Sequence, residues 1–246
     1  MSAAMSPGTA TAAATKPAEP RYAIYFAPPA QSPLWRFGSA VLGYDAETGE
    51  APPLPELKRF DATRWHEITA EPRRYGFHGT LKAPFRLAAG RTETELRAVC
   101  ARFAKDRAGF ACAGVTLNTI GRFLALRLAV PSAALDRLAA GAVAAFDDFR
   151  APMSETEREK RLRAPLTPRQ QDYLARWGYP YVLEDFRFHM TLTGSLDDDE
   201  RTLAEAELAE HFAMSGADGP LIVREIALYR QEAGPFRLVA RFPFGS

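Results

Sequence analysis

Short apolar runs alternate with amphipathic helical segments along this chain of 246 residues. Runs rich in β-branched and aromatic residues predict strands at residues 21–27, 76–82, 114–120, 121–128, 186–192, 221–229 and 236–242. Apolar residues at helical spacing predict a short helix at 34–41 and further helices behind the N-caps Asp61, Thr92, Ser132, Ser154, Thr167 and Asp197. The pattern therefore predicts strands and helices in a mixed order.

Two regions stand apart from this alternation. Residues 1–20 are mostly Ala, Thr, Ser and Pro, and we expect a disordered tail because they bury too little apolar surface to offset the entropy of ordering. Residues 150–180 carry two capped helices and are interpreted as a helical insertion in one domain spanning 21–246. The basic run at 158–163 is interpreted as a solvated helix face, with a lid over an anionic substrate as the alternative.

The order of the predicted elements repeats along the chain. Each of two histidine-bearing strands is followed by a capped helix, a strand and a second strand. The separation from His78 to Leu117 is 39 residues, and that from His189 to Ala227 is 38 residues. A duplicated unit of this kind predicts two lobes related by an approximate twofold axis, with the histidine strands facing each other across a central cleft.

Both histidine strands contain the pattern His-x-Thr-Leu, 111 positions apart. Because side chains alternate between the two faces of a strand, His78 and Thr80 should point the same way, and so should His189 and Thr191. An imidazole beside a hydroxyl, supplied twice, suits a phosphate site that needs two groups to move protons. The competing interpretation of one strand histidine is a hydrogen-bonded structural residue, and the doubled motif weakens it.

Four further side chains are candidates for substrate contacts. If the strands continue regularly, Lys82 lies on the face of His78 and Arg187 on the face of His189, where either cation could neutralise phosphate charge. Tyr25 is a candidate for stacking or for a hydroxyl contact, and Arg230 for binding a second phosphate.

The strings YGFHGTLKAPF, LTPRQ, WGYPYV and FRFHMTLTG, within residues 21–246, resemble the 2H phosphoesterase superfamily, and more closely an uncharacterised branch assigned to phosphonate metabolism. The superfamily includes RNA-ligase-like and cyclic-nucleotide phosphodiesterases. The resemblance implies a bilobal α+β fold in which two antiparallel sheets flank a central cleft and helices lie outside. It also implies metal-independent hydrolysis or transesterification of a small, often cyclic, phosphodiester without a cofactor.

In that chemistry His78 and His189 would be the general acid and base, and Thr80 and Thr191 would bind the phosphate. Unperturbed imidazoles have a pKa of about 6.5, which suits both tasks near neutral pH. Which histidine is the acid, and whether water or a substrate hydroxyl attacks, stays open at this point. The expected partner is a small phosphorylated substrate, a cyclic phosphate or a nucleotide, bound by a monomer.

Composition narrows the alternatives. The net charge of +1 gives no broad basic field, so an RNA-end-processing cyclic phosphodiesterase stays an alternative that the charge does not favour. Cys100 and Cys112 are too few for a cysteine-rich zinc site or a disulfide framework, so we expect a reduced, cytoplasmic protein. No apolar run reaches the ~18 residues of a membrane span. A non-catalytic phosphate-ligand-binding protein is the alternative from another functional class, and a metal hydrolase fits poorly.

Overall fold

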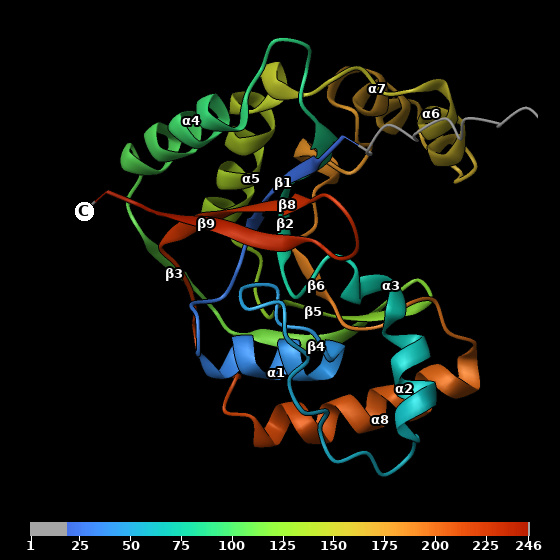
Figure 1. The fold of residues 1–246 in the computed structure, drawn as a ribbon. Helices are drawn as coiled ribbons and strands as arrows, with labels where there is room; N and C mark the ends of the chain where they lie inside the picture. Colours follow the sequence, from blue (N-terminus) through green and yellow to red (C-terminus); the bar gives the residue numbers. More distant parts are fainter. Residues whose placement is uncertain (1–18, 246) are drawn as a thin grey trace, which may run out of the picture.

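The computed structural model describes residues 19–245, and two antiparallel sheets organise it (Figure 1). The first sheet has the order β2-β1-β8-β9 and consists of β1 (Arg21–Phe26), β2 (Gly79–Arg86), β8 (Glu225–Gln231) and β9 (Arg237–Pro243). The second has the order β4-β5-β6 and consists of β4 (Val115–Ile120), β5 (Phe123–Leu128) and β6 (His189–Thr191). A separate antiparallel pair joins β3 (Phe110–Cys112) to β7 (Leu221–Val223).

Helices cover the outer sides of both sheets. The helix α4 (Glu93–Lys105) contacts β8 and β9, α5 (Ala133–Ala145) contacts β2, and α8 (Asp198–Met214) contacts β4 and β5. In Figure 1, α1 (Pro33–Leu42), α2 (Ala62–Ile68) and the short α3 (Ala70–Arg73) lie on the side of the second sheet. The predicted insertion forms α6 (Glu155–Leu162) and α7 (Pro168–Trp177). The α+β fold with two antiparallel sheets is therefore confirmed.

Each of the two sheets combines strands from both copies of the sequence repeat. One copy runs β2-α4-β3-β4-β5 and the other runs β6-α8-β7-β8-β9. Nevertheless, β2 lies in the sheet of β8 and β9, whereas β6 pairs with β5. Each lobe is thus built from the histidine strand and helix of one copy and the last hairpin of the other. The repeat predicted two lobes but not this exchange, because each hairpin closes on itself and its sequence does not show which histidine strand it joins.

The predicted caps begin the helices as expected. Three caps form complete capping boxes, in which the cap side chain and the third helical residue bond to each other's backbone N–H; they are Thr92, Ser154 and Thr167. The side chains of Asp61, Ser132 and Asp197 also accept a backbone N–H at the starts of α2, α5 and α8. Gly178 ends α7 with φ of 72°, a conformation that glycine adopts without steric cost.

Several strand boundaries differ from the prediction. The first histidine strand begins at Gly79 and continues through Pro84 to Arg86, because β2 is an edge strand in which a missing backbone N–H costs little. The second is only three residues long, since its pairing with β5 begins at His189 and not at Phe186. The strand expected at 221–229 divides into β7 and β8, and β3 was not predicted.

A continuous apolar core joins the two lobes. One cluster of buried side chains includes Phe26 and Leu228 of the first sheet together with Leu124 and Met190 of the second. The rings of Phe26 and Phe188 meet edge to face, with centroids 5.8 Å apart. The cleft walls are therefore connected through packed side chains. Within residues 19–245, no helix has the length and apolar character needed to span a membrane. Of the tail predicted at residues 1–20, positions 1–18 lie outside the described residues.

Candidate active site

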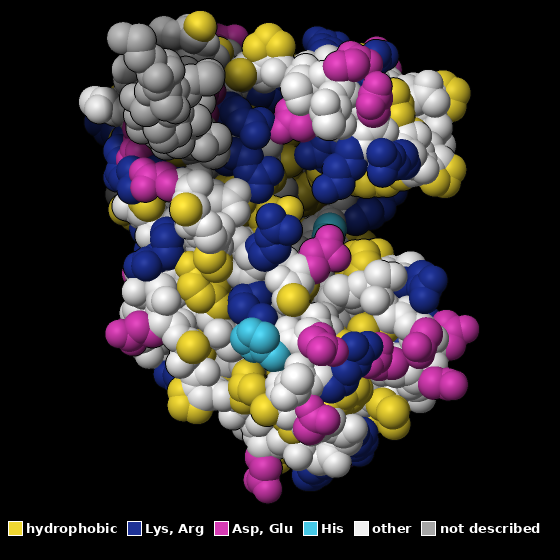
Figure 2. All heavy atoms as spheres, turned by 45° about the vertical axis from the view of Figure 1, so that its right-hand side comes forward, with side chains coloured by type: hydrophobic (Ala, Val, Ile, Leu, Met, Phe, Trp, Pro, Cys, Tyr) yellow, Lys and Arg dark blue, Asp and Glu magenta, His cyan; other side chains and the backbone are white. Residues whose placement is uncertain are grey.

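A cleft between the sheets brings the two histidine motifs together. Its cavity of about 370 Å³ is lined by His78 and Thr80 from one lobe and by His189 and Thr191 from the other. Figure 2 shows a hollow between two parts of the surface, with Lys and Arg side chains gathered on its upper rim. In both motifs, the histidine and the threonine reach the same cavity, as strand alternation predicts.

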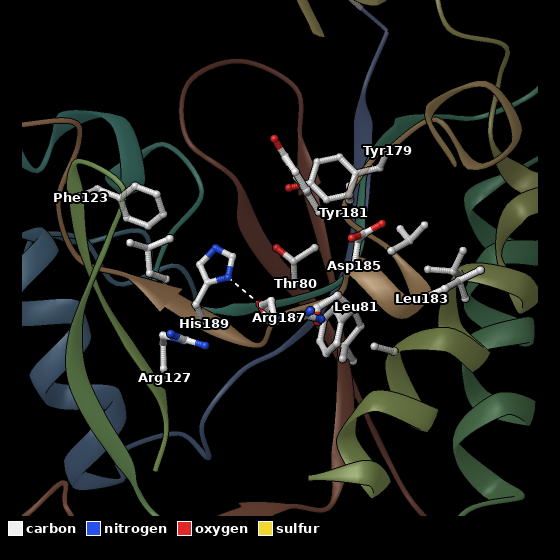
Figure 3. Close-up of a pocket in the computed structure, with 16 residues that line it drawn as sticks. Thr80, Leu81, Phe123, Arg127, Tyr179, Tyr181, Leu183, Asp185, Arg187 and His189 are labelled. Atoms are coloured by element: carbon white, nitrogen blue, oxygen red, sulfur yellow. Dashed lines mark hydrogen bonds between the residues drawn. The ribbon is translucent and has the colours of Figure 1, made fainter. Parts of the chain in front are cut away.

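Both imidazoles are held in the same way. Nδ1 of His78 lies 2.8 Å from the carbonyl oxygen of Gly76. Nδ1 of His189 lies 2.8 Å from the carbonyl oxygen of Arg187, the contact drawn as a dashed line in Figure 3. A backbone carbonyl can only accept, so Nδ1 of each ring carries the proton and donates it. Nε2 is then the nitrogen that remains for chemistry in each ring. In both copies of the repeat, the histidine thus contacts the carbonyl oxygen of the residue two positions before it.

The ring of Tyr25 lies against His78. Their centroids are 3.7 Å apart and the planes are inclined by 19°, so the rings are stacked. At the edge of the imidazole, Nε2 of His78 lies 3.2 Å from Oγ1 of Thr80. Tyr25 is 1% exposed and borders the cavity. The ring of Tyr25, predicted to stack on the substrate or to contact it through its hydroxyl, therefore stacks on His78 and orients its imidazole.

Burial makes both imidazoles harder to protonate. The pKa of His78 is lowered to about 4, mainly by burial; the Gly76 carbonyl opposes this change, and the charge of His189 adds to it. The pKa of His189 is also lowered, mainly by burial, with the Arg187 carbonyl opposing the shift and Arg127 adding to it. A bound phosphate anion favours the protonated form and raises both pKa values.

Gly79 allows the two histidine strands to approach each other. A Cβ atom at this position would lie 2.3 Å from a ring carbon of Phe188, the residue that precedes His189. Because Gly79, next to His78, has no side chain, there is room for the ring of Phe188, next to His189. This is a close approach of the kind that glycine permits within a strand.

Gly79→Ala should lower kcat about tenfold, because the new methyl group must displace Phe188 and with it His189, and small misplacements of reacting groups are costly. Gly219→Ala is the matched control, since nothing lies within 4 Å of a Cβ built there. Adding Phe188→Leu to Gly79→Ala should restore part of the activity. Wild-type kcat in the single variant, measured beside its thermal unfolding, would contradict this role of Gly79.

The prediction for Lys82 is wrong. Tyr25 pairs with Thr80, but the next residue back, Ile24, pairs with Lys82, so β2 contains one extra residue between these pairs. Such a bulge breaks the alternation of side chains. Lys82 is buried, and its ammonium group donates to Asp147 at 2.7 Å and to a backbone carbonyl of α5 at 2.9 Å. It stabilises the packing of α5 on β2 and does not line the described cavities.

The other two predicted cations have different positions. Arg230 does not reach the cleft, because its guanidinium pairs with Glu93 at 3.0 Å and with Glu232 at 3.4 Å. Arg187 does lie with His189, on the wall of a second cavity (Figure 3). Its side chain donates to the backbone carbonyls of Glu184 and Phe186.

The second cavity adjoins the first and has a volume of about 520 Å³. Its wall is mainly apolar, and the two cavities share the lining residues Thr80, Ala83, Phe123, Tyr179 and His189. Arg127 also lines it and lies opposite His189 in the pairing of β5 with β6. Sequence analysis missed Arg127, although it stands in the hairpin that the repeat identifies.

Two more arginines were missed as site residues. Arg21 and Arg161 line the first cavity together with Tyr179. Arg161 belongs to the basic run at 158–163, and for this residue the solvated-face interpretation is wrong, because it borders the cleft. Within residues 19–245, no group of three or more His, Cys, Asp and Glu side chains is placed to hold a metal ion.

The chain is similar to known proteins over most of its length. The family described as "Protein of unknown function (DUF1045)" matches residues 80–237. A relative from Janthinobacterium sp. (strain Marseille), named "Ribose 1,5-bisphosphate phosphokinase PhnN", is 38% identical over 229 residues, which are 91% of this chain and 51% of the relative. A relative with the same name from Laribacter hongkongensis (strain HLHK9) is 40% identical over 225 residues, 89% of this chain and 50% of the relative. The chain thus spans about half the length of these curated relatives.

Solved structures with a similar fold include E. coli LigT complexed with ATP. It is 12% identical, has a TM-score of 0.42, and the match covers 93% of this chain and 100% of LigT. Kluyveromyces marxianus Usb1 is 13% identical with a TM-score of 0.37, over 91% of this chain and 98% of Usb1.

Proposed function

This chain belongs to the DUF1045 family of proteins of unknown function, and we propose that it is a phosphodiesterase that opens a small cyclic phosphodiester between His78 and His189. One observation carries the proposal: two imidazoles, each held by the same Nδ1–carbonyl contact, line one cavity with a threonine hydroxyl supplied beside each. Displacement at phosphorus needs the attacking and leaving oxygens roughly in line, on opposite sides. Two proton-transfer groups on opposite lobes meet this need.

The electrostatics of the cleft favour one division of roles. His78 has its pKa lowered to about 4, so its Nε2 is unprotonated and can take a proton from the attacking water. His189, protonated on Nε2 when the substrate anion is bound, gives that proton to the leaving oxygen as the P–O bond breaks. Without substrate, the Thr80 hydroxyl donates to the unprotonated Nε2 of His78 at 3.2 Å. When substrate binds, this hydroxyl turns to donate to a nonbridging oxygen, as that of Thr191 does, and leaves Nε2 free to take the proton of the water. The cycle ends with His78 protonated and His189 neutral, and exchange with solvent restores both.

The names of the two relatives suggest a substrate to test first. They are ribose 1,5-bisphosphate phosphokinases, and this chain matches half of each. Hydrolysis of the cyclic 1,2-phosphate of ribose 5-phosphate at its O2–P bond would yield ribose 1,5-bisphosphate. We therefore place this cyclic ester first, within the setting of phosphonate metabolism that the sequence resemblance suggests.

The test is turnover of a panel of cyclic phosphates, followed by ³¹P NMR. The panel contains ribose 1,2-cyclic phosphate, its 5-phosphate and the nucleoside 2′,3′-cyclic phosphates, each with and without EDTA. We expect a phosphomonoester product in both conditions. Complete loss of turnover in EDTA would contradict the metal-free mechanism. Tight binding without turnover of any panel member would instead support the non-catalytic alternative.

The pH dependence of kcat/KM should be bell-shaped with an acidic optimum. Activity should rise as the pH increases through about 4, where His78 loses its proton and becomes a base. It should fall as the pH increases through the pKa of His189, which burial places below the ordinary value of 6.5. Initial rates at low substrate concentration between pH 3.5 and 8 measure both limbs. A kcat/KM that still rises above pH 7 would contradict this assignment.

A further inference from the structure

Two arginines that the proposed chemistry does not use face the cavity of the histidines. Arg21 enters from β1 and Arg161 from α6, and both line the space that holds His78 and His189. Neither guanidinium forms an ion pair with a carboxylate anywhere in residues 19–245. Their positive charge is therefore not neutralised within the described structure.

Neutral groups hold both side chains in place. Nε and Nη2 of Arg21 donate to the amide oxygen of Gln231 at 2.9 and 2.7 Å, and its guanidinium lies 5.3 Å from the ring centroid of Phe236. The guanidinium of Arg161 lies 5.1 Å from the ring centroid of Tyr179. Amide and aromatic partners fix the position of a cation but leave its charge available to an anion.

Unlike Arg21 and Arg161, the neighbouring Arg230 is paired with carboxylates. It follows Tyr229 on β8, next to the strand that carries Arg21, but Glu93 and Glu232 pair with it. Among the residues that line the first cavity, Glu71 is the carboxylate, and it lies beside Gly194 of the other lobe, not in an ion pair with Arg21 or Arg161. Two guanidinium groups that have no carboxylate partner within residues 19–245 thus line the cavity that holds the histidines.

From this arrangement, and resting on the proposed function, we infer that Arg21 and Arg161 bind a second phosphate on the substrate. The substrate class is then a cyclic phosphodiester that also carries a phosphate monoester. The diester lies between the histidines, and the monoester accepts hydrogen bonds from the two guanidinium groups. A cavity of about 370 Å³ has room for a sugar bisphosphate of this kind.

The test compares two substrates that differ only in the second phosphate: ribose 1,2-cyclic phosphate with and without a 5-phosphate. The wild-type protein should prefer the phosphorylated substrate at least about 100-fold in kcat/KM, as expected for two charge-assisted contacts. Arg21→Gln and Arg161→Gln should each reduce this preference about tenfold, and the double variant should nearly abolish it. All three should lose much less activity on the unphosphorylated ester than on the phosphorylated one.

Arg163→Gln is the matched control, because Arg163 belongs to the same basic run, is exposed and does not line the described cavities. It should keep the full preference. A wild-type preference near unity, or equal losses on both substrates in the arginine variants, would overturn the inference.

A second measurement separates this inference from the proposed function. Calorimetric titration with ribose 1,5-bisphosphate should show weaker binding to Arg161→Gln than to the wild type and to Arg163→Gln. If neither cyclic ester is turned over, the proposed function fails, whereas the binding difference still decides the second-phosphate site. Equal affinities in all three proteins would reject the site even if the diester is hydrolysed.

Discussion

Replacing either His78 or His189 by alanine should lower kcat/KM at least about a thousandfold, because each removes one proton-transfer group, and such groups contribute roughly 10²–10⁴-fold. Each substitution also leaves a backbone carbonyl without its imidazole donor, a contact of 2.8 Å in both cases. Circular dichroism and thermal unfolding should therefore accompany the kinetics. The folded fraction should stay high, because both side chains border a cavity.

The matched control is His66→Ala. His66 is exposed on α2 and lines neither cavity of the cleft, so its removal should leave kcat/KM unchanged. The two active-site variants should also differ in their pH profiles: the limb near pH 4 should disappear in His78→Ala, and the upper limb in His189→Ala. Wild-type rates in both variants would remove this cleft as the catalytic site.

Thr80→Val and Thr191→Val should each reduce kcat about a hundredfold with little effect on folding. Valine has the shape of threonine and suits a strand, but it lacks the hydroxyl that would donate to a nonbridging oxygen. Loss of one comparable donor at a developing oxyanion costs roughly 10²–10³-fold. Thr80→Val should also alter the limb assigned to His78, because Oγ1 of Thr80 lies 3.2 Å from Nε2 of that ring.

Two variants test whether the hydroxyl itself is responsible. Thr80→Ser and Thr191→Ser keep the donor and should retain most of the activity. Thr119→Val makes the same chemical change on the exposed side of β4, away from the cleft, and should behave like the wild type. Comparable kcat values for Thr80→Val, Thr191→Val and Thr119→Val would show that the hydroxyls do not bind the reacting phosphate.

The predictable parts of the fold depend on interactions between near neighbours in the sequence. The capping box at Thr92 joins residues only three positions apart, Thr92 and Glu95, so the local sequence is sufficient to predict where the helix begins. The passage of β2 through Pro84 depends on its being an edge strand, and that follows from pairings with distant segments. The exchange of hairpins likewise follows from contacts such as Arg21 with Gln231, 210 positions apart.

The candidate site divides in the same way. The doubled His-x-Thr pattern identified the four residues that the cleft brings together. Lys82 was misplaced because a bulge has no sequence signature here, and Arg230 because Glu93 neutralises it from another element. Arg21 and Arg161 belong to no motif. They become candidates only when two segments 140 positions apart line one cavity.

The exchange of hairpins between the lobes bears on how the protein folds. Ile24 of β1 must find Leu228 of β8, and β6 must find β5, before either wall of the cleft is complete. Pairings between such distant positions make for slow folding, because the intervening chain must be closed into a loop first. A fragment ending after β5 contains β1 and β2 without their partners β8 and β9, and the complementary fragment contains β6 without β5. The cleft is therefore a late product of a cooperative assembly, because neither half of the chain can build one of its walls alone.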